Sequence, residues 1–281
     1  LSRTLLRFFA NDNLMVKAII PPKYKFPLWF LLKSPQRKLG YQTLWQDMKG
    51  IALFCVMRFW PWMPMQPISI CVGLKNRSPL FLDKFVDSLA KCKNQKLIEL
   101  SVFDCGSDDI EDLEAKIRER FSGKLVFSQE EMPFSRAASF NKAVIQSHNE
   151  LIFICDADFS IPKQIVSMVN RYTLLHAVWF PIVFYLFKNK PEVFGKENGE
   201  WMQWGGKGIL ACQKSDFLKV GMLDERFVEW GGEDEELWLR FYRNGYAIIR
   251  NREKQLLHHW HPSHNPKYKK LAELAELESL Q

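Results

Sequence analysis

The chain has 281 residues, which suffices for one large α/β domain or for a domain with an extension. Its hydrophobic share of 47% and its charged share of 25% are those of an ordinary globular protein. The net charge of +7 is unevenly distributed, because residues 1–66 contain ten Lys or Arg and two Asp (10 − 2 = +8), which leaves −1 for the rest. This distribution argues against a nucleic-acid groove in the main body and restricts that interpretation to residues 1–66.

Residues 1–66 are expected to form a basic, aromatic-rich N-terminal extension. Lys and Arg are interleaved there with Trp and Phe, a composition that suits an anionic bilayer surface. The alternative is a helical extension that packs on the main domain with its basic side in water. The most apolar stretch, residues 51–65, is interrupted by Arg58, Pro61 and Pro64 and is too short to span a bilayer. We therefore expect a cytoplasmic protein, peripheral at the inner membrane face, or one in the Golgi lumen if an anchor precedes this chain.

The six cysteines are scattered along the chain without any CxxC pair. Cys71, Cys105 and Cys155 fall in or just after expected strands, where a free cysteine acts as a small hydrophobe. A reducing compartment is the simplest interpretation, although the sequence leaves disulfide pairing open.

From residue 67 onward, apolar strands alternate with helices. Ser78 is expected to cap the first helix, with Pro79 at its first position, and Ser135 to cap a helix that runs through Ser147. The other expected helices are 111–121, 163–176 and 233–244, and the expected strands are 68–73, 97–103, 125–127, 151–155, 177–187, 208–212 and 246–249. Residues 188–206 are expected to form a loop that could order over a ligand, and 267–281 a tail with an amphipathic helix at 268–280. This alternation predicts a main domain at 67–266 with a mostly parallel sheet flanked by helices, whose ligands bind at the carboxyl ends of the strands.

Carboxylates and imidazoles follow two of the apolar strands. Asp156 and Asp158 come just after the strand at 151–155, and in an extended Asp-x-Asp both side chains point the same way, toward a divalent cation or a ligand held by it. Asp after a strand is also a common turn former. His258 and His261 form a later pair, and imidazole with carboxylate suits Mn²⁺ and related ions. The alternatives are surface histidines or a zinc pair, and the lack of a thiol nearby in the sequence disfavours structural zinc.

A third cluster opens the helix at 233–244. Trp230 and the pair Gly231-Gly232 precede a run of four carboxylates that begins with Glu233 and Asp234. The helix dipole favours acids at this position, but four adjacent carboxylates repel one another, so the dipole does not explain the run. A solvated helix start is the alternative to a site. Because the three clusters all lie at strand or helix ends, we expect them to form one site.

Two further strand ends carry polar side chains. Lys75-Asn76-Arg77 follows the first strand and Asp104 ends the second, where an α/β sheet would hold a nucleotide. Asp accepts hydrogen bonds from a base N–H, and Arg suits a phosphate or a base edge. The sequence contains neither GxGxxG nor GxxxxGKS, which disfavours dinucleotide and P-loop binding.

Together these motifs resemble those of a known group. The segment from about residue 68 to 266 resembles GT-A fold nucleotide-sugar glycosyltransferases, in particular the galactosyltransferase C-terminal and chondroitin-synthase type families, with family 2 enzymes as cousins. The resemblance covers roughly 200 of the 281 residues. It rests on these motifs in this order: Lys75-Asn76-Arg77, Asp104, Phe134-Ser135-Arg136-Ala137, Asn141-Lys142-Ala143, Asp156-Ala157-Asp158, Trp230-Gly231-Gly232-Glu233-Asp234 and His258-x-x-His261.

The resemblance implies a GT-A, Rossmann-like α/β fold and a set of site residues. It implies that the nucleotide sugar is bound by Asn76, Arg77, Asp104, Arg136 and Asp156, with Asp104 and its neighbours on the uridine. It makes Asp158 and His261 ligands of Mn²⁺, or of another divalent cation such as Mg²⁺, with His258 as a second late ligand. It places the acceptor sugar against Trp230, Gly231 and Gly232, with Glu233 hydrogen-bonded to it and Asp234 as the catalytic base.

The implied function is metal-dependent transfer of a sugar of the Gal, GalNAc or GlcNAc type from a UDP-sugar to a saccharide or glycoconjugate acceptor. Retaining polypeptide N-acetylgalactosaminyltransferases carry Asn where this chain has Asp234, so the acid favours inversion of the anomer. A retaining enzyme of that kind is one alternative. Another is a non-catalytic partner subunit that keeps the fold, although such subunits usually lose metal or base residues that are present here.

Overall fold

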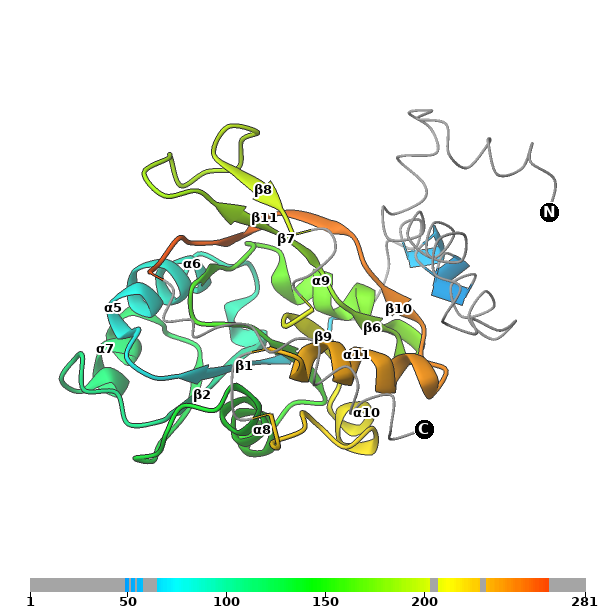
Figure 1. Ribbon diagram of the computed structural model, residues 1–281, viewed down its shortest axis with the longest axis horizontal. Helices are drawn as coiled ribbons and strands as arrows, with labels where there is room; N and C mark the ends of the chain where they lie inside the picture. Colours follow the sequence, from blue (N-terminus) through cyan, green and yellow to red (C-terminus); the bar gives the residue numbers. More distant parts are fainter. Residues whose placement is uncertain are drawn as a thin grey trace.

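The computed structural model describes residues 49–50, 52–53, 55–57, 65–202, 207–227 and 231–262. Within these ranges the strands form a seven-stranded sheet, ordered β10-β6-β9-β4-β1-β2-β3, and a four-stranded sheet, ordered β5-β11-β7-β8 (Figure 1). The strands of the larger sheet are β1 (Ile68–Leu74), β2 (Ile98–Asp104), β3 (Lys124–Gln129), β4 (Leu151–Ile154), β6 (Val178–Trp179), β9 (Leu210–Gln213) and β10 (Ile248–Ile249). Those of the smaller sheet are β5 (Phe159–Ser160), β7 (Ile182–Leu186), β8 (Gly199–Trp201) and β11 (Arg252–His258).

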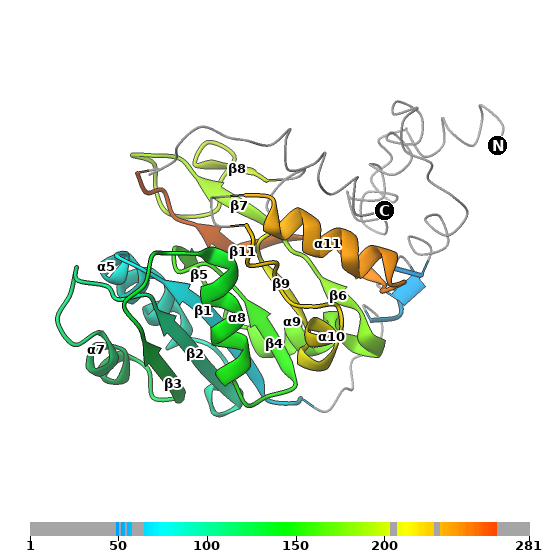
Figure 2. The ribbon, with the colours of Figure 1, turned by 60° about the horizontal axis from the view of Figure 1, so that its bottom comes forward.

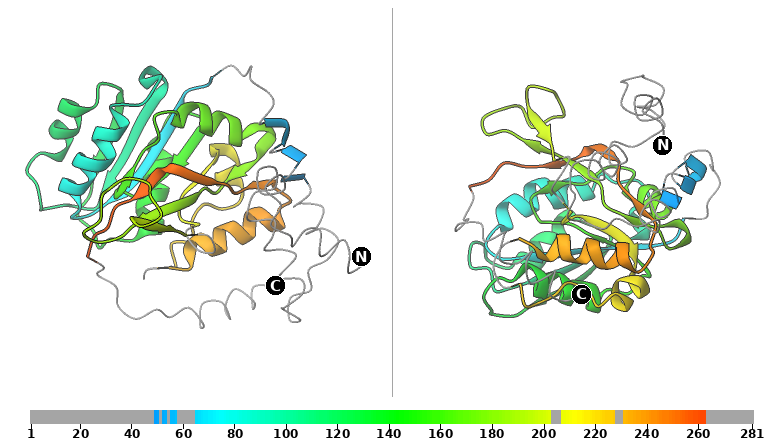
Figure 3. Two further views of the ribbon diagram at one scale, coloured as in Figure 1. Left: turned by 90° about the horizontal axis from the view of Figure 1, so that it is seen from above. Right: turned by 45° about the vertical axis from the view of Figure 1, so that its right-hand side comes forward.

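The helices cover both faces of the larger sheet. They are α5 (Ser78–Leu80), a π-helical turn (Phe81–Val86) that continues into α6 (Asp87–Leu89), α7 (Leu113–Arg120), α8 (Arg136–Gln146), α9 (Ile165–Tyr172), α10 (Lys214–Lys219) and α11 (Glu233–Arg243), with 3-10 turns at Gln95–Leu97 and Leu174–His176. Figures 2 and 3 show α8, α10 and α11 on one face. The other face is covered by three elements: the continuous helical rod at residues 78–89 (α5, the π-helical turn and α6), helix α7 and helix α9.

The larger sheet is mostly parallel, as the alternating pattern predicts. β1 pairs in parallel with β2 and β4, whereas β9 runs antiparallel to β4 and β6. Every residue of β1 and β2 is buried, because both faces of these central strands are covered. The register pairs Leu74 with Asp104, so both strands end at one edge and the polar residues that follow them lie side by side.

Two helix caps explain where helices begin beside that edge. Ser135 caps α8, with its Oγ 3.3 Å from the backbone nitrogen of Ala138, which confirms the expected cap. Asp112 caps α7 in the same way, through the backbone nitrogen of Ala115. The first helix begins one residue earlier than expected, since Ser78 is helical and Arg77 occupies the N-cap position.

The smaller sheet contains strands that the sequence analysis does not assign. β8 lies in the segment expected to be a loop, and β11 is largely polar. β11 runs antiparallel to β5 with His258 opposite Phe159, and parallel to β7. This pairing carries the histidines of the C-terminal segment to the residues that follow β4. Helix α10 is also absent from the expected elements.

The described part of the N-terminal extension packs on the main body. Residues 49–50, 52–53 and 55–57 are helical, and Met57 is fully buried in the larger core cluster. The remainder of residues 1–64 and the tail helix expected at 268–280 lie outside the described residues, so membrane association of the extension stays a prediction. Among the residues that are described, no helix is both long and apolar enough to cross a bilayer. The six cysteines are free thiols, five of them buried.

We predict that Gly73→Ala destabilises the fold by about 1–3 kcal/mol, the usual cost of overpacking a core. A Cβ at Gly73 would lie 2.2 Å from Ser139 Oγ of α8 and 2.7 Å from Ser139 Cβ. Chemical denaturation measures the loss, and adding Ser139→Ala should restore part of it by removing the nearest atom. A Gly73→Ala protein as stable as the wild type would contradict this packing of α8 on β1.

Candidate active site

The candidate site lies at the carboxyl edge of the larger sheet. The segments that follow β1, β2 and β4 meet there. The start of α11 and the end of β11, which come later in the sequence, lie beside them (Figure 2). Most of the residues named from the sequence therefore come together. Trp230 lies outside the described residues, so its position is not part of this geometry.

Asp158, His258 and His261 form a cluster of potential metal ligands. One ligand atom of each residue lies within 4.8 Å of those of the other two. His261 Nε2 lies 3.0 Å from Asp158 Oδ2, and His258 Nε2 lies 3.6 Å from Asp158 Oδ1. The Asp158 side chain is 3% exposed, so its charge needs partners nearby.

The surroundings fix the orientation of both imidazoles. His261 Nδ1 lies 2.9 Å from the carbonyl oxygen of Pro262, to which it can donate, so Nε2 is the nitrogen that faces Asp158. His258 stacks on Tyr185, with ring centroids 4.1 Å apart, and meets the edge of Phe159. Neither ring can turn away without breaking these contacts.

The pKa values follow from burial and from this geometry. Burial alone would raise the pKa of Asp158, but the hydrogen bond with His261 and the charges of His258 and Arg77 hold it below its ordinary value. The hydrogen bond with Asp158 raises the pKa of His261. Burial lowers the pKa of His258, against the opposing effect of Asp158.

This donor set fits a divalent cation. Asp158 Oδ1 is buried and has no hydrogen-bond partner among the described residues, an arrangement that leaves a carboxylate oxygen for a metal bond. One carboxylate and two imidazoles suit Mn²⁺ and related ions.

Arg77 lies against this cluster. Its Nη1 pairs with Asp158 Oδ2 and lies 3.1 Å from His261 Nε2. The guanidinium thus contacts the candidate metal ligands, whereas the sequence analysis assigns it to the nucleotide. Its side chain is 35% exposed, so it remains accessible to a ligand at this edge.

Asn76 and Asp104 are joined by the turn after β2. The backbone nitrogen of Asn76 donates to Ser107 Oγ, and the Asn76 side chain accepts from the nitrogen of Asp108. Asp104 is fully buried, and its carboxylate accepts hydrogen bonds from Ser107 and from Gln129. A uridine contact with Asp104 would therefore replace one of these bonds.

Arg136 connects the turn after β4 to the start of α11. Its guanidinium donates to both oxygens of Asp156, at 2.9 and 3.3 Å, to Glu233 Oε1 at 3.1 Å and to the carbonyl of Gly208 at 2.8 Å. A planar fork of five N–H donors can make these four hydrogen bonds at once, whereas a lysine ammonium has only three donors. The structure thus brings Asp156 and Glu233 together through a residue assigned to the nucleotide sugar.

The glycine pair ahead of α11 has the backbone conformation that favours glycine. Gly231 and Gly232 have φ values of 95° and 103°. Among the described residues, no atom lies within 4 Å of the position that a Cβ at Gly231 would take. Asp234 follows on the first turn, where its Oδ1 accepts from the nitrogen of Glu235. Burial raises the pKa of Glu233, and the negative charge of Asp234 adds to this shift while Arg136 opposes it.

Two basic residues beside α11, Arg250 and Lys207, were not predicted from the sequence to belong to the site. Arg250 is 5% exposed, and burial lowers its pKa to about 10, although Asp234 and Glu235 offset part of this effect. Lys207 Nζ lies 3.6 Å from Glu235 Oε1, and burial lowers its pKa as well. Arg250 comes directly after the apolar strand β10, and Asp156 comes two residues after the apolar strand β4. A polar residue just after an apolar strand is therefore the sequence signal that could have identified Arg250.

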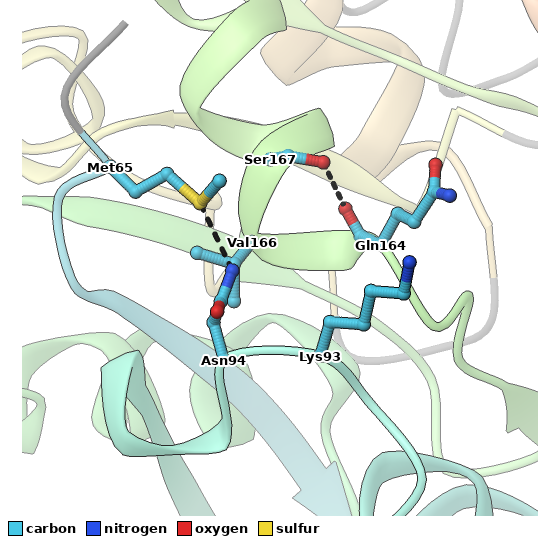
Figure 4. Close-up of a pocket in the computed structure, with 6 residues that line it drawn as sticks. All are labelled: Met65, Lys93, Asn94, Gln164, Val166 and Ser167. Carbon is cyan, nitrogen blue, oxygen red and sulfur yellow. Dashed lines mark hydrogen bonds between the residues drawn. The ribbon is translucent and has the colours of Figure 1, made fainter.

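A cavity of about 210 Å³ lies elsewhere in the molecule (Figure 4). Met65, Asn94, Gln164 and Ser167 are among its lining residues. Met65 precedes β1 and Asn94 precedes β2, so the cavity lies at the amino edge of the sheet, away from the clustered carboxylates and imidazoles.

Solved structures share this fold. S. aureus TarS 1–349 in complex with UDP matches with a TM-score of 0.58 and 18% identity, over 76% of this chain and 64% of that chain. A mannosyltransferase, PcManGT from Pyrobaculum calidifontis in complex with GDP-Man and Mn²⁺, matches with a TM-score of 0.51 and 14% identity, over 82% and 67% of the two chains. These likenesses confirm the expected GT-A fold.

Curated relatives match the same part of the chain. Mus musculus chondroitin sulfate synthase 3 is 28% identical over 218 residues, which are 70% of this chain and 24% of that protein. Mus musculus chondroitin sulfate N-acetylgalactosaminyltransferase 2 is 26% identical over 220 residues, 70% of this chain and 40% of that protein. This chain therefore spans less than half the length of either relative. The family model described as chondroitin N-acetylgalactosaminyltransferase matches residues 68–274. The chain belongs to the chondroitin N-acetylgalactosaminyltransferase family.

Proposed function

We propose that this chain is a metal-dependent glycosyltransferase that moves a sugar from a UDP-sugar to a saccharide acceptor with inversion of the anomer. The observation that carries the proposal is the cluster of Asp158, His258 and His261 on the sheet edge that also holds Asp156 and the carboxylates of α11. The relatives' names favour N-acetylgalactosamine as the sugar. We assign the activity to residues 67–266, which nearly coincide with the matched region.

The donor would bind across the ends of β1, β2 and β4. Asp158, His258 and His261 would hold a divalent cation such as Mn²⁺, which when bound offsets negative charge on a diphosphate. Arg77 is near enough to this cluster to contact the diphosphate. Asn76 and Asp104, both bonded to Ser107 of the turn after β2, would contact the uridine. Arg136 holds Asp156 in place for the ribose or the donor sugar.

The acceptor would bind at the start of α11. No described atom lies within 4 Å of the Cβ position of Gly231, which leaves room for a sugar there. Glu233 would hydrogen-bond to this sugar, and Trp230 would supply an apolar platform. Asp234 would take the proton of the acceptor hydroxyl as its oxygen attacks the anomeric carbon and the bond to the diphosphate breaks. The backbone nitrogen of Glu235 donates to Asp234 Oδ1 and so helps to orient this carboxylate. A single displacement of this kind inverts the anomer.

The first prediction concerns the cation. Calorimetry should show tighter UDP binding with Mn²⁺ than without it. Asp158→Asn should weaken Mn²⁺ binding at least about tenfold, because removing a group that only orients a ligand already lowers metal affinity by about 10–100-fold, and Asp158 is a ligand itself. Asp87→Asn, an exposed change on α6, is the matched control. Equal UDP affinity of the wild type with and without Mn²⁺ would rule out a metal-bridged donor.

The second prediction concerns the base. Asp234→Asn keeps the shape of the side chain and removes its basicity, so transfer should fall by about 10²–10⁴-fold while UDP and Mn²⁺ still bind. Glu235→Gln, on the adjacent residue, is the control and should keep most of the activity. Near-normal turnover of Asp234→Asn, or an NMR spectrum of the product that shows a retained anomer, would refute the role of Asp234.

A further inference from the structure

The loop between β7 and β8 contacts the segment that carries the candidate metal ligands. Glu192 of this loop pairs with Lys84 in the helical rod after β1, and its Oε2 lies 3.5 Å from His259 Nδ1. His259 is 3% exposed, whereas the Glu192 side chain is 52% exposed. A surface carboxylate thus reaches a buried imidazole that lies between His258 and Trp260 in the sequence.

His259 is held on its other sides as well. Its Nε2 lies 2.6 Å from Ser160 Oγ, and its backbone nitrogen donates to the carbonyl oxygen of Asp158 at 2.8 Å. This last bond extends the pairing of β11 with β5, in which His258 lies opposite Phe159. His259 is thus bonded to the backbone of Asp158 and to Ser160, beside the candidate ligand His258.

We propose that Glu192 and His259 are positioning residues for the cation site. Successive side chains of an extended segment point to opposite sides, so the His259 ring lies away from His258 and acts through the backbone. Ser160 Oγ is hydrogen-bonded to Nε2 of the His259 ring, and the Glu192 carboxylate lies 3.5 Å from Nδ1, a buried atom with no hydrogen-bond partner among the described residues. These two groups thereby hold the ring and with it the segment between His258 and His261. The proposal rests on the function proposed above.

This role differs from a simple contribution to stability. An exposed ion pair such as Glu192 with Lys84 adds little to the free energy of folding. Groups that orient metal ligands, in contrast, typically change metal affinity by about 10–100-fold when they are removed. Loss of Glu192 should therefore appear in cation binding and leave the melting temperature nearly unchanged.

The test is Mn²⁺ binding to Glu192→Ala at a fixed concentration of UDP, measured by calorimetry. We expect affinity for Mn²⁺ to fall about tenfold and the KM for Mn²⁺ to rise in proportion, with kcat at saturating Mn²⁺ within about twofold of the wild type. Glu197→Ala, an exposed glutamate on the same loop, is the matched control and should bind Mn²⁺ like the wild type. Glu192→Gln keeps an oxygen that can face His259 and should recover most of the affinity.

The outcomes separate this proposal from the function on which it rests. Mn²⁺ affinities of Glu192→Ala and Glu197→Ala that agree within twofold would overturn the positioning role, as would a Glu192→Gln protein as weak as the alanine variant. A kcat that falls while the KM for Mn²⁺ stays constant would overturn it too. A wild type that binds no Mn²⁺ would instead overturn the proposed metal-dependent transfer.

Discussion

The guanidinium of Arg136 joins the two halves of the candidate site. It is mostly buried, and it pairs at once with Asp156 from the turn after β4 and with Glu233 from the start of α11. Without the guanidinium of Arg136, the carboxylates of Asp156 and Glu233 would lie near each other with little water to screen their charges. Glu233 would then be buried without a charged partner. The turn after β4 and the start of α11 depend on this interaction for their relative position.

Two sheets with different roles surround that interaction. The parallel sheet brings the ends of β1, β2 and β4 to one edge, as its hydrogen-bond register requires. The smaller sheet supplies the imidazoles of the candidate metal site, because β11 pairs with β5 and places His258 beside Asp158. A carboxylate from one part of the chain and imidazoles about a hundred residues later thus form one donor set.

Much of the fold and of the site could be predicted from the sequence, and the misses have physical causes. The strands of the parallel sheet are apolar runs, and Ser135 caps a helix, so local patterns sufficed for these elements. β11 was missed because its residues from Arg252 to Gln255 are polar and only partner strands make them extended. The contacts of Arg77 with Asp158 and of Arg136 with Glu233 join residues 81 and 97 positions apart, which no local pattern reveals.

The position of the bound cation tests the central claim most directly. A crystal structure of the protein with UDP and Mn²⁺, recorded with anomalous data at the manganese edge, would locate the ion without reference to activity. The account predicts one anomalous peak bonded to Asp158, His258 and His261 and adjacent to the diphosphate of UDP. A peak bonded elsewhere, or UDP bound away from the ends of β1, β2 and β4, would contradict it.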